Sequence, residues 1–187
     1  MRSCRVSLVL IALAPISLAS PVRAEMQEPA DIWTGPMHGE TPATLAGAKV
    51  VDAEGVAKLK DGDKAVLLDV AETPKKPEKI SSDAPWLPIH LTIPGAVWLA
   101  NAGLGRPDPE FQRRFGERVA ALTGGDKNKS LVVFCHSRCW GSWNAAKRLV
   151  MLGYAEVFWF PEGVEGWQEK FSTAPTKEDA VWNEMNR

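Results

Sequence analysis

Apolar residues along the chain fall into short continuous runs that alternate with longer stretches of helical spacing. The continuous runs cover residues 65–68, 97–99, 131–134 and 157–160. Such runs are typical of strands buried on both faces of a parallel sheet. Apolar positions with helical spacing lie between or after these runs: Val56 and Leu59; Phe111, Phe115, Val119 and Leu122; Ala145, Leu149 and Leu152. Strands that alternate with helices predict an α/β fold with a mainly parallel sheet.

Polar residues mark where the predicted helices begin. Asp52 is a suitable N-cap for the first helix, and Asp108, with a proline directly after it, for the second. Ser142 is the expected N-cap of the third helix. Thr176 and Asp179 have the spacing of a capping box, which predicts a last helix beginning at Thr176.

Segments rich in proline and glycine divide the chain into four parts. After residues 1–24 we expect an irregular lead-in at 25–47, one domain at 48–172, and a C-terminal helix and tail at 173–187. Within the domain, residues 72–92 hold four prolines and predict a long loop, and a turn is expected after the run that ends at residue 160.

The N-terminal residues 1–24 have the layout of a secretory signal peptide. Arg2 and Arg5 precede a 14-residue apolar stretch, residues 6–19, that is too short for a comfortable membrane span. Cleavage is expected after Ala24, and an uncleaved anchor is the alternative. Processing removes three arginines and changes the net charge from −1 to −4. A mildly acidic chain without another long apolar segment gives no reason to expect nucleic acid or a membrane as its partner.

Two cysteines remain after processing, because Cys4 leaves with the signal peptide. A Cys135–Cys139 bond would close a loop of about five residues and gain only ~2 kcal/mol, against ~4.7 kcal/mol for a loop of 100 residues. The pair is therefore better interpreted as two reactive cysteines than as a disulfide that stabilises the fold. Cys135 follows a predicted strand and precedes a helix, where backbone N–H groups favour an anion. Lowering a thiol pKa from ~8.5 to ~6.5 needs ~2.7 kcal/mol, which the helix dipole alone does not supply.

The second half of the chain resembles a rhodanese domain. The resemblance is carried by LVVFC, NAAKRLVMLGY and VFWFPEGVEGW, and upstream by VLLDV and IPGAVWL. It implies a rhodanese-like open sheet flanked by helices on both faces, with Cys135 as a nucleophile that carries sulfur as a persulfide. It also implies a small sulfur-containing anion or a thiol acceptor as partner.

A narrower resemblance is to exported rhodanese-like proteins with a Cys-x-x-x-Cys-Trp motif, which accompany pyrroloquinoline-quinone (PQQ)-dependent alcohol catabolism in bacteria. The motif is formed here by Cys135, Cys139 and Trp140. This resemblance implies a periplasmic protein that supports a quinoprotein dehydrogenase system. The loop after Cys135 is then expected to hold a redox partner and substrate-binding residues: Cys139 as the partner, and His136, Ser137, Arg138, Trp140 and Gly141 for the substrate.

The chain departs from ordinary rhodaneses in its loop, which is one residue longer and holds Cys139 and Trp140. Thr92 also stands where the family usually has a histidine. Rhodanese-related phosphatases need an arginine six residues after the cysteine; Gly141 stands there, which excludes that class.

Two other functions stay open: a thiol–disulfide module that uses Cys135 and Cys139, and a non-catalytic accessory protein of a quinoprotein system. No cofactor or metal is expected. Haem attachment needs a histidine after the second cysteine, and structural zinc needs four ligands, although two thiolates could bind Cu(I). Plainer interpretations also remain, namely a solvent-facing Arg138, a His136 that points away, a packed Trp140 and a Cys139 that is only a loop residue.

Overall fold

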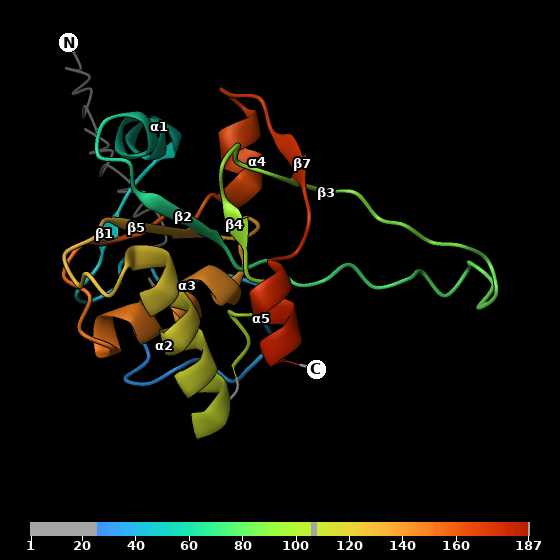
Figure 1. Cartoon of the computed structure of the whole chain (residues 1–187), viewed down its shortest axis with the longest axis horizontal. Coiled ribbons are helices and arrows are strands. Elements are labelled where there is room, and N and C mark those ends of the chain that lie inside the picture. The colour runs from blue at the N-terminus through green and yellow to red at the C-terminus, as the bar shows by residue number, and fades with distance from the viewer. Residues whose placement is uncertain (1–25, 106–107, 187) are drawn as a thin grey trace, which may run out of the picture.

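The computed structural model describes residues 26–105 and 108–186, so the predicted signal peptide lies outside the described residues. A parallel five-stranded sheet forms its centre (Figure 1). The strands run in the order β1 (Lys49–Val50), β6 (Val157–Trp159), β5 (Leu131–Phe134), β2 (Val66–Asp69) and β4 (Val97–Trp98). Each of the four continuous apolar runs of the sequence thus contributes one strand.

Helices cover both faces of this sheet, which confirms the predicted α/β class (Figure 1). On one face lie α1 (Ala53–Asp61) and α4 (Gly163–Gln168). On the other lie α2 (Pro109–Thr123), α3 (Trp140–Met151) and α5 (Ala180–Met185).

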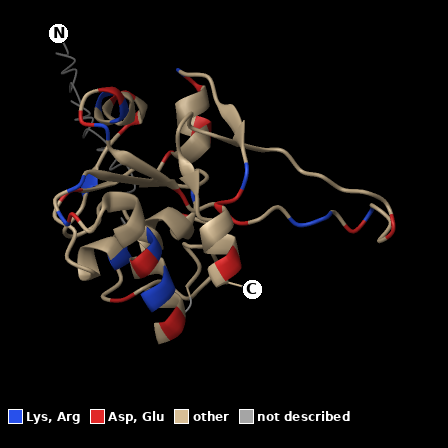
Figure 2. Cartoon of the chain, viewed as in Figure 1, with Lys and Arg blue, Asp and Glu red and all other residues tan. Residues whose placement is uncertain are grey.

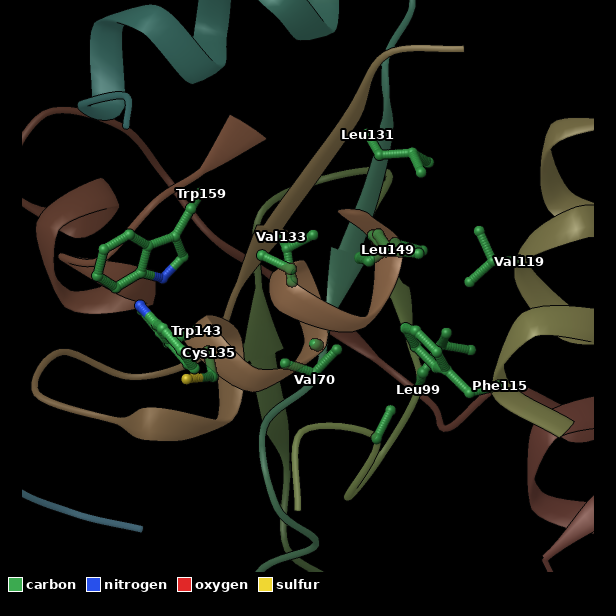
Figure 3. Packing of buried hydrophobic residues seen from close by; sticks show 14 of the residues in the cluster. Val70, Leu99, Phe115, Val119, Leu131, Val133, Cys135, Trp143, Leu149 and Trp159 are labelled. Atoms are coloured by element: carbon green, nitrogen blue, oxygen red, sulfur yellow. The ribbon is translucent and has the colours of Figure 1, made fainter. Parts of the chain in front are cut away.

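Strand β5 lies in the middle of the sheet, and all four of its residues are buried. Alternate side chains of a strand point to opposite faces. Leu131 and Val133 pack in the cluster that includes α2 and α3, as Figure 3 shows, whereas Val132 and Phe134 pack in the cluster with α1 and α4. Burial on both faces explains why this stretch of sequence has no polar position, and it fixes the end of β5, where Cys135 follows.

Two of the predicted helix starts are confirmed. The Asp52 carboxylate accepts from the N–H of Gly55 at the start of α1, and Asp108 accepts from the N–H of Glu110 at the start of α2. Helix α2 ends at Gly124, whose φ of 64° is in the left-handed region that favours glycine. Lys and Arg alternate with Asp and Glu on α2, as Figure 2 shows, so its outer face carries no charge of a single sign.

Three other predictions were wrong. Helix α3 begins at Trp140, two residues before the predicted cap Ser142, which is buried inside its first turn. Thr176 belongs to strand β7, and Asp179 alone caps α5. The segment interpreted as a turn after residue 160 forms α4. At the starts of α3 and α5, tertiary contacts outweighed the local capping signal.

A second, two-stranded sheet joins β3 (His90–Thr92) antiparallel to β7 (Ala174–Thr176). The predicted long loop leads into β3 and projects far from the body (Figure 1). Its side chains Leu87 and Ile89 are 90% and 77% exposed. Among the helices of the described part of the chain, none is both long and apolar enough to span a membrane.

We expect Asp179 to hold α5 on the body. Its carboxylate accepts from the N–H of Trp182 at 2.8 Å and from the Arg118 guanidinium through both oxygens at 2.8 Å. Asp179→Ala should lower the free energy of unfolding by about 2–3 kcal/mol in urea, because it removes the cap and a charge-assisted pair. Asp179→Asn, which keeps a capping oxygen, should lose about half as much. Equal stability of all three proteins would contradict this assignment.

Candidate functional site

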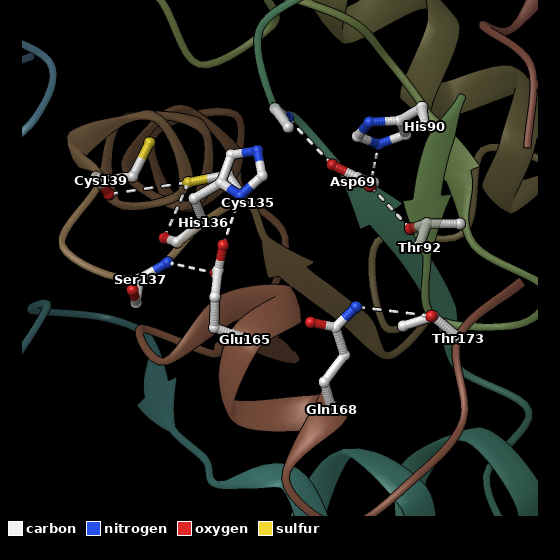
Figure 4. Close-up of polar contacts among 11 residues, drawn as sticks. Asp69, His90, Thr92, Cys135, His136, Ser137, Cys139, Glu165, Gln168 and Thr173 are labelled. Atoms are coloured by element: carbon white, nitrogen blue, oxygen red, sulfur yellow. Dashed lines mark hydrogen bonds and ion pairs between the residues drawn. The ribbon is translucent and has the colours of Figure 1, made fainter. Parts of the chain in front are cut away.

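Cys135 follows the last residue of β5, and its loop ends where α3 begins (Figure 4). Its side chain is 1% exposed. The N–H of Ser142 donates to its sulfur at 3.2 Å. The first N–H groups of a helix have no partner within the helix, and here one of them is given to a sulfur atom. The buried residue that was predicted to cap α3 therefore acts through its backbone on Cys135.

Cys139 lies beside Cys135 at the start of α3. Both are free thiols, and Cys139 is 5% exposed. The Cys135 thiol donates to the Cys139 carbonyl at 3.7 Å and to the His136 carbonyl at 3.6 Å. Gly141 leaves room for the pair: a Cβ at this position would come within 3.3 Å of the Cys139 sulfur and 3.7 Å of the Cys135 sulfur. The structure thus brings the predicted nucleophile and its predicted redox partner together.

The two thiols have pKa values shifted in opposite directions. Burial raises the pKa of Cys135 well above the usual value, and the neighbouring Cys139 raises it further, whereas the contacts with Ser142 act to lower it. The neighbouring Cys135 thiol lowers the pKa of Cys139 to about 6 against the effect of burial, helped by the backbone of Gly141 and by the nearby His38. Cys139 is therefore the more acidic thiol of the pair.

Glu165 of α4 holds the near end of the loop. Its carboxylate accepts from the N–H of Ser137 at 2.8 Å and lies 2.8 Å from Nδ1 of His136. These two contacts keep the pKa of Glu165 below its usual value, although burial acts to raise it. His136 and Ser137 are thus held by a carboxylate outside the loop. Sequence analysis missed Glu165, because no motif links it to residues 28 positions earlier.

Arg138 is the turning point of the loop. Its φ of 52° is in the left-handed region, which is unusual for a residue with a side chain. Its guanidinium lies 3.6 Å from Glu40 and its side chain is 72% exposed. The structure therefore places the cation at the surface, next to a carboxylate.

Residues 33–40 of the lead-in, which we call the strap, cover the loop. His38 forms an antiparallel bridge with Cys139. The N–H of Gly39 donates to the Arg138 carbonyl at 2.9 Å, and the N–H of Trp140 donates to the Met37 carbonyl at 2.8 Å. The strap is thus paired with the loop along both sides of Cys139.

Stacked aromatic rings hold the start of the strap. Trp33 stacks on Trp140 with ring centroids 4.4 Å apart, and the backbone of Trp33 exchanges two hydrogen bonds with the Asn144 side chain. Trp140 is 2% exposed and also contacts Trp143 edge-on. Sequence analysis predicted an irregular lead-in packed on the surface, but not this pairing, because an isolated two-residue bridge has no periodic signal.

A buried polar cluster lies at the end of the neighbouring strand β2 (Figure 4). The Asp69 carboxylate lies 2.7 Å from Nε2 of His90 and accepts from the Thr92 hydroxyl at 2.6 Å. It also accepts from the N–H of Ala71 at 2.9 Å. Thr92, which stands where a histidine is usual, thus anchors β3 to β2.

A cavity of about 370 Å³ opens beside the loop, on the side of Ser137 and Glu165. Its charged lining residues are mostly acidic, and Lys170 is the only cation among them. The remaining lining residues are Asp52, Ala53, Glu162, Gly166, Glu169 and Lys170. This side of the loop is unfavourable for a sulfur-containing anion. Over residues 26–105 and 108–186, no group of three or more His, Cys, Asp or Glu side chains is arranged to hold a metal ion.

Comparison with known proteins gives a family and a set of similar structures. A model of the family "Rhodanese-like domain" matches residues 52–170. No curated protein matches the chain.

Among solved structures, thiosulfate sulfurtransferase from Pseudomonas aeruginosa is 18% identical, with a TM-score of 0.44 over 74% of this chain and 23% of that chain. SseA from Escherichia coli, a 3-mercaptopyruvate sulfotransferase by its description, is 21% identical, with a TM-score of 0.45 over 71% of this chain and 53% of that one. The human single-domain sulfurtransferase TSTD1 is 22% identical, with a TM-score of 0.39 over 68% of this chain and 99% of that chain. The chain thus spans less than a quarter of the first protein and about half of the second.

The strap should limit access to both sulfurs. Trp33→Ala removes the stack on Trp140 and weakens the strap, so we expect iodoacetamide to label the two cysteines about 10-fold faster or more, as local opening becomes easier. Met26→Ala, at an exposed residue before the strap, is the matched control. Equal labelling of the two variants would show that the strap does not cover the sulfurs.

The pair should titrate as a single acid near pH 6. Thiolate absorbance in the ultraviolet should rise to one equivalent per chain as the pH passes about 6, because below this pH both thiols are protonated. In Cys139→Ser the step should move to higher pH, since burial still raises the pKa of Cys135. A step that stays near pH 6 in this variant would place the charge on Cys135 instead.

Proposed function

Because the chain belongs to the rhodanese-like domain family, we propose that it is a sulfurtransferase that carries sulfur as a persulfide on Cys135. One observation carries this proposal. The sulfur that follows the central strand receives the N–H of Ser142 at 3.2 Å, at the start of a helix. Such a position stabilises negative charge on the sulfur, both before attack and on the persulfide that forms.

The neighbouring Cys139 supplies a route for activating Cys135, because both sulfurs lie beside Gly141. The Cys135 proton passes to the Cys139 thiolate, which leaves the charge on Cys135. With thiosulfate as donor, Cys135 attacks the outer sulfur, and the sulfur–sulfur bond of the donor breaks. Sulfite leaves with the electron pair of that bond, and Cys135 keeps the transferred sulfur. A thiol acceptor then removes it.

A substrate must pass the strap to reach the two sulfurs. Both sulfurs are almost fully buried, and most of the charged residues that line the cavity beside Ser137 are acidic. A sulfur-containing anion therefore enters from the strap side, where Arg138 is the exposed cation of the loop. In this arrangement His136 and Ser137 keep the loop in shape through Glu165, and Gly141 keeps the space between the sulfurs free.

We also propose where the protein works and which metabolism it serves. The sequence layout of residues 1–24 supports export to the periplasm, with cleavage after Ala24. The Cys-x-x-x-Cys-Trp motif supports a role beside PQQ-dependent alcohol oxidation, with a quinoprotein dehydrogenase system as partner.

Mature protein incubated with thiosulfate should gain the mass of one sulfur atom and release one equivalent of sulfite. Intact-mass spectrometry and a sulfite assay measure the two products. Cys135→Ser should lower sulfite release by about 10³-fold or more, because it removes the nucleophile. A folded Cys135→Ser protein that releases sulfite at the original rate would exclude Cys135 as the sulfur carrier.

A further inference from the structure

The two sulfurs of the loop share one buried space beside Gly141, where an added Cβ would lie 3.3 Å from the Cys139 sulfur and 3.7 Å from the Cys135 sulfur. Cys135 is 1% exposed and Cys139 is 5% exposed, and the Cys135 thiol donates to the Cys139 carbonyl at 3.7 Å. The strap covers them through the bridge between His38 and Cys139. Any sulfur atom carried on Cys135 therefore meets the Cys139 side chain before it meets a thiol from outside.

We propose that Cys139 resolves the Cys135 persulfide within the chain, so that the carried sulfur leaves as hydrosulfide and the two cysteines form a disulfide. This inference rests on the proposed function, since it needs the persulfide to form. It assigns to the chain a dithiol-dependent reduction of sulfane sulfur, in place of simple passage to an acceptor.

The atoms and electrons of this step balance within the site. The Cys139 sulfur attacks the inner sulfur, which is that of Cys135, and a Cys135–Cys139 bond forms. The bond between Cys135 and the carried sulfur breaks, and its electron pair leaves with the carried sulfur. The Cys139 proton passes to that sulfur, which departs as HS⁻. The two thiols are oxidised and the carried sulfur is reduced. A small dithiol then reduces the disulfide and is itself oxidised to a disulfide.

Two features of the site favour attack on the inner sulfur. Attack on the outer sulfur would expel Cys135 as a thiolate, and burial together with Cys139 raises the pKa of that thiol. A high pKa makes a poor leaving group in thiol exchange, so hydrosulfide departs more readily. Ser142 already donates its N–H to the Cys135 sulfur, which holds that sulfur beside Cys139 as the bond forms.

Proximity gives Cys139 its advantage over external thiols. Reacting groups held in contact have effective concentrations far above those of dissolved acceptors. Here Gly141 lets the two sulfurs share one space, since a Cβ in its place would lie 3.3 Å and 3.7 Å from them. An external thiol would first have to displace the strap. The internal reaction is therefore the faster one.

The test follows the mature full-length chain after one equivalent of thiosulfate, without a reductant. We expect the wild-type mass to gain one sulfur briefly and then to settle two hydrogens below that of the starting dithiol protein. One equivalent of sulfide should appear, trapped with bromobimane. Cys139→Ser and Cys139→Ala should gain the sulfur more slowly, because they lack the proton acceptor, but should then hold it, with sulfide release slowed about 100-fold or more after loading.

The outcomes separate this inference from the proposed function. A wild-type persulfide that persists like that of Cys139→Ser, without sulfide, would overturn the resolving role and leave sulfur transfer intact. If neither wild type nor the Cys139 variants gain sulfur, both the proposed function and this inference fail. Should the variants not fold, the wild type alone decides: without any reductant, one equivalent of sulfide should appear together with a protein mass two hydrogens below that of the starting dithiol, and a persulfide that persists without sulfide would contradict the mechanism.

Discussion

The hydrogen bond from the first turn of α3 to the Cys135 sulfur sets the character of this site. A helix that begins directly after a loop leaves several N–H groups unpaired, and most helices give them to a capping side chain or to water. Here Cys139 occupies the cap position without a capping bond of its own, and Ser142 donates its N–H to Cys135. This contact opposes the effect of burial on the pKa of Cys135, and the rest of the site is arranged around it.

The scaffold fixes this contact from two directions. Strand β5 is central and buried on both faces, so its end cannot shift without disturbing both apolar clusters. Helix α4 holds the start of the loop, because the N–H of Val164 donates to the Cys135 carbonyl at 2.9 Å. Gly163 must lack a side chain, because a Cβ there would collide with the same carbonyl. The strap then seals the outer side through backbone hydrogen bonds.

Much of the fold could be predicted from the sequence, because the signals were periodic or continuous. Buried strands such as residues 131–134 have no polar position, and Asp52 and Asp108 cap their helices through local geometry. Ser142 was misjudged because a serine near a helix start usually acts through its hydroxyl, whereas here its backbone N–H meets a sulfur. The likeness to rhodaneses pointed to Cys135. Glu165 and the strap could not be predicted, because each acts through contacts between segments far apart in the chain.

The bridge between His38 and Cys139 also bears on the oxidation of the two sulfurs. Peroxides convert accessible thiolates to sulfenic acid and then to sulfinic acid, a step that thiols do not reverse. Susceptibility to this damage follows thiolate character and exposure, and Cys135 and Cys139 are 1% and 5% exposed. Because the backbone of the strap lies over Cys139, small oxidants have little access to the pair.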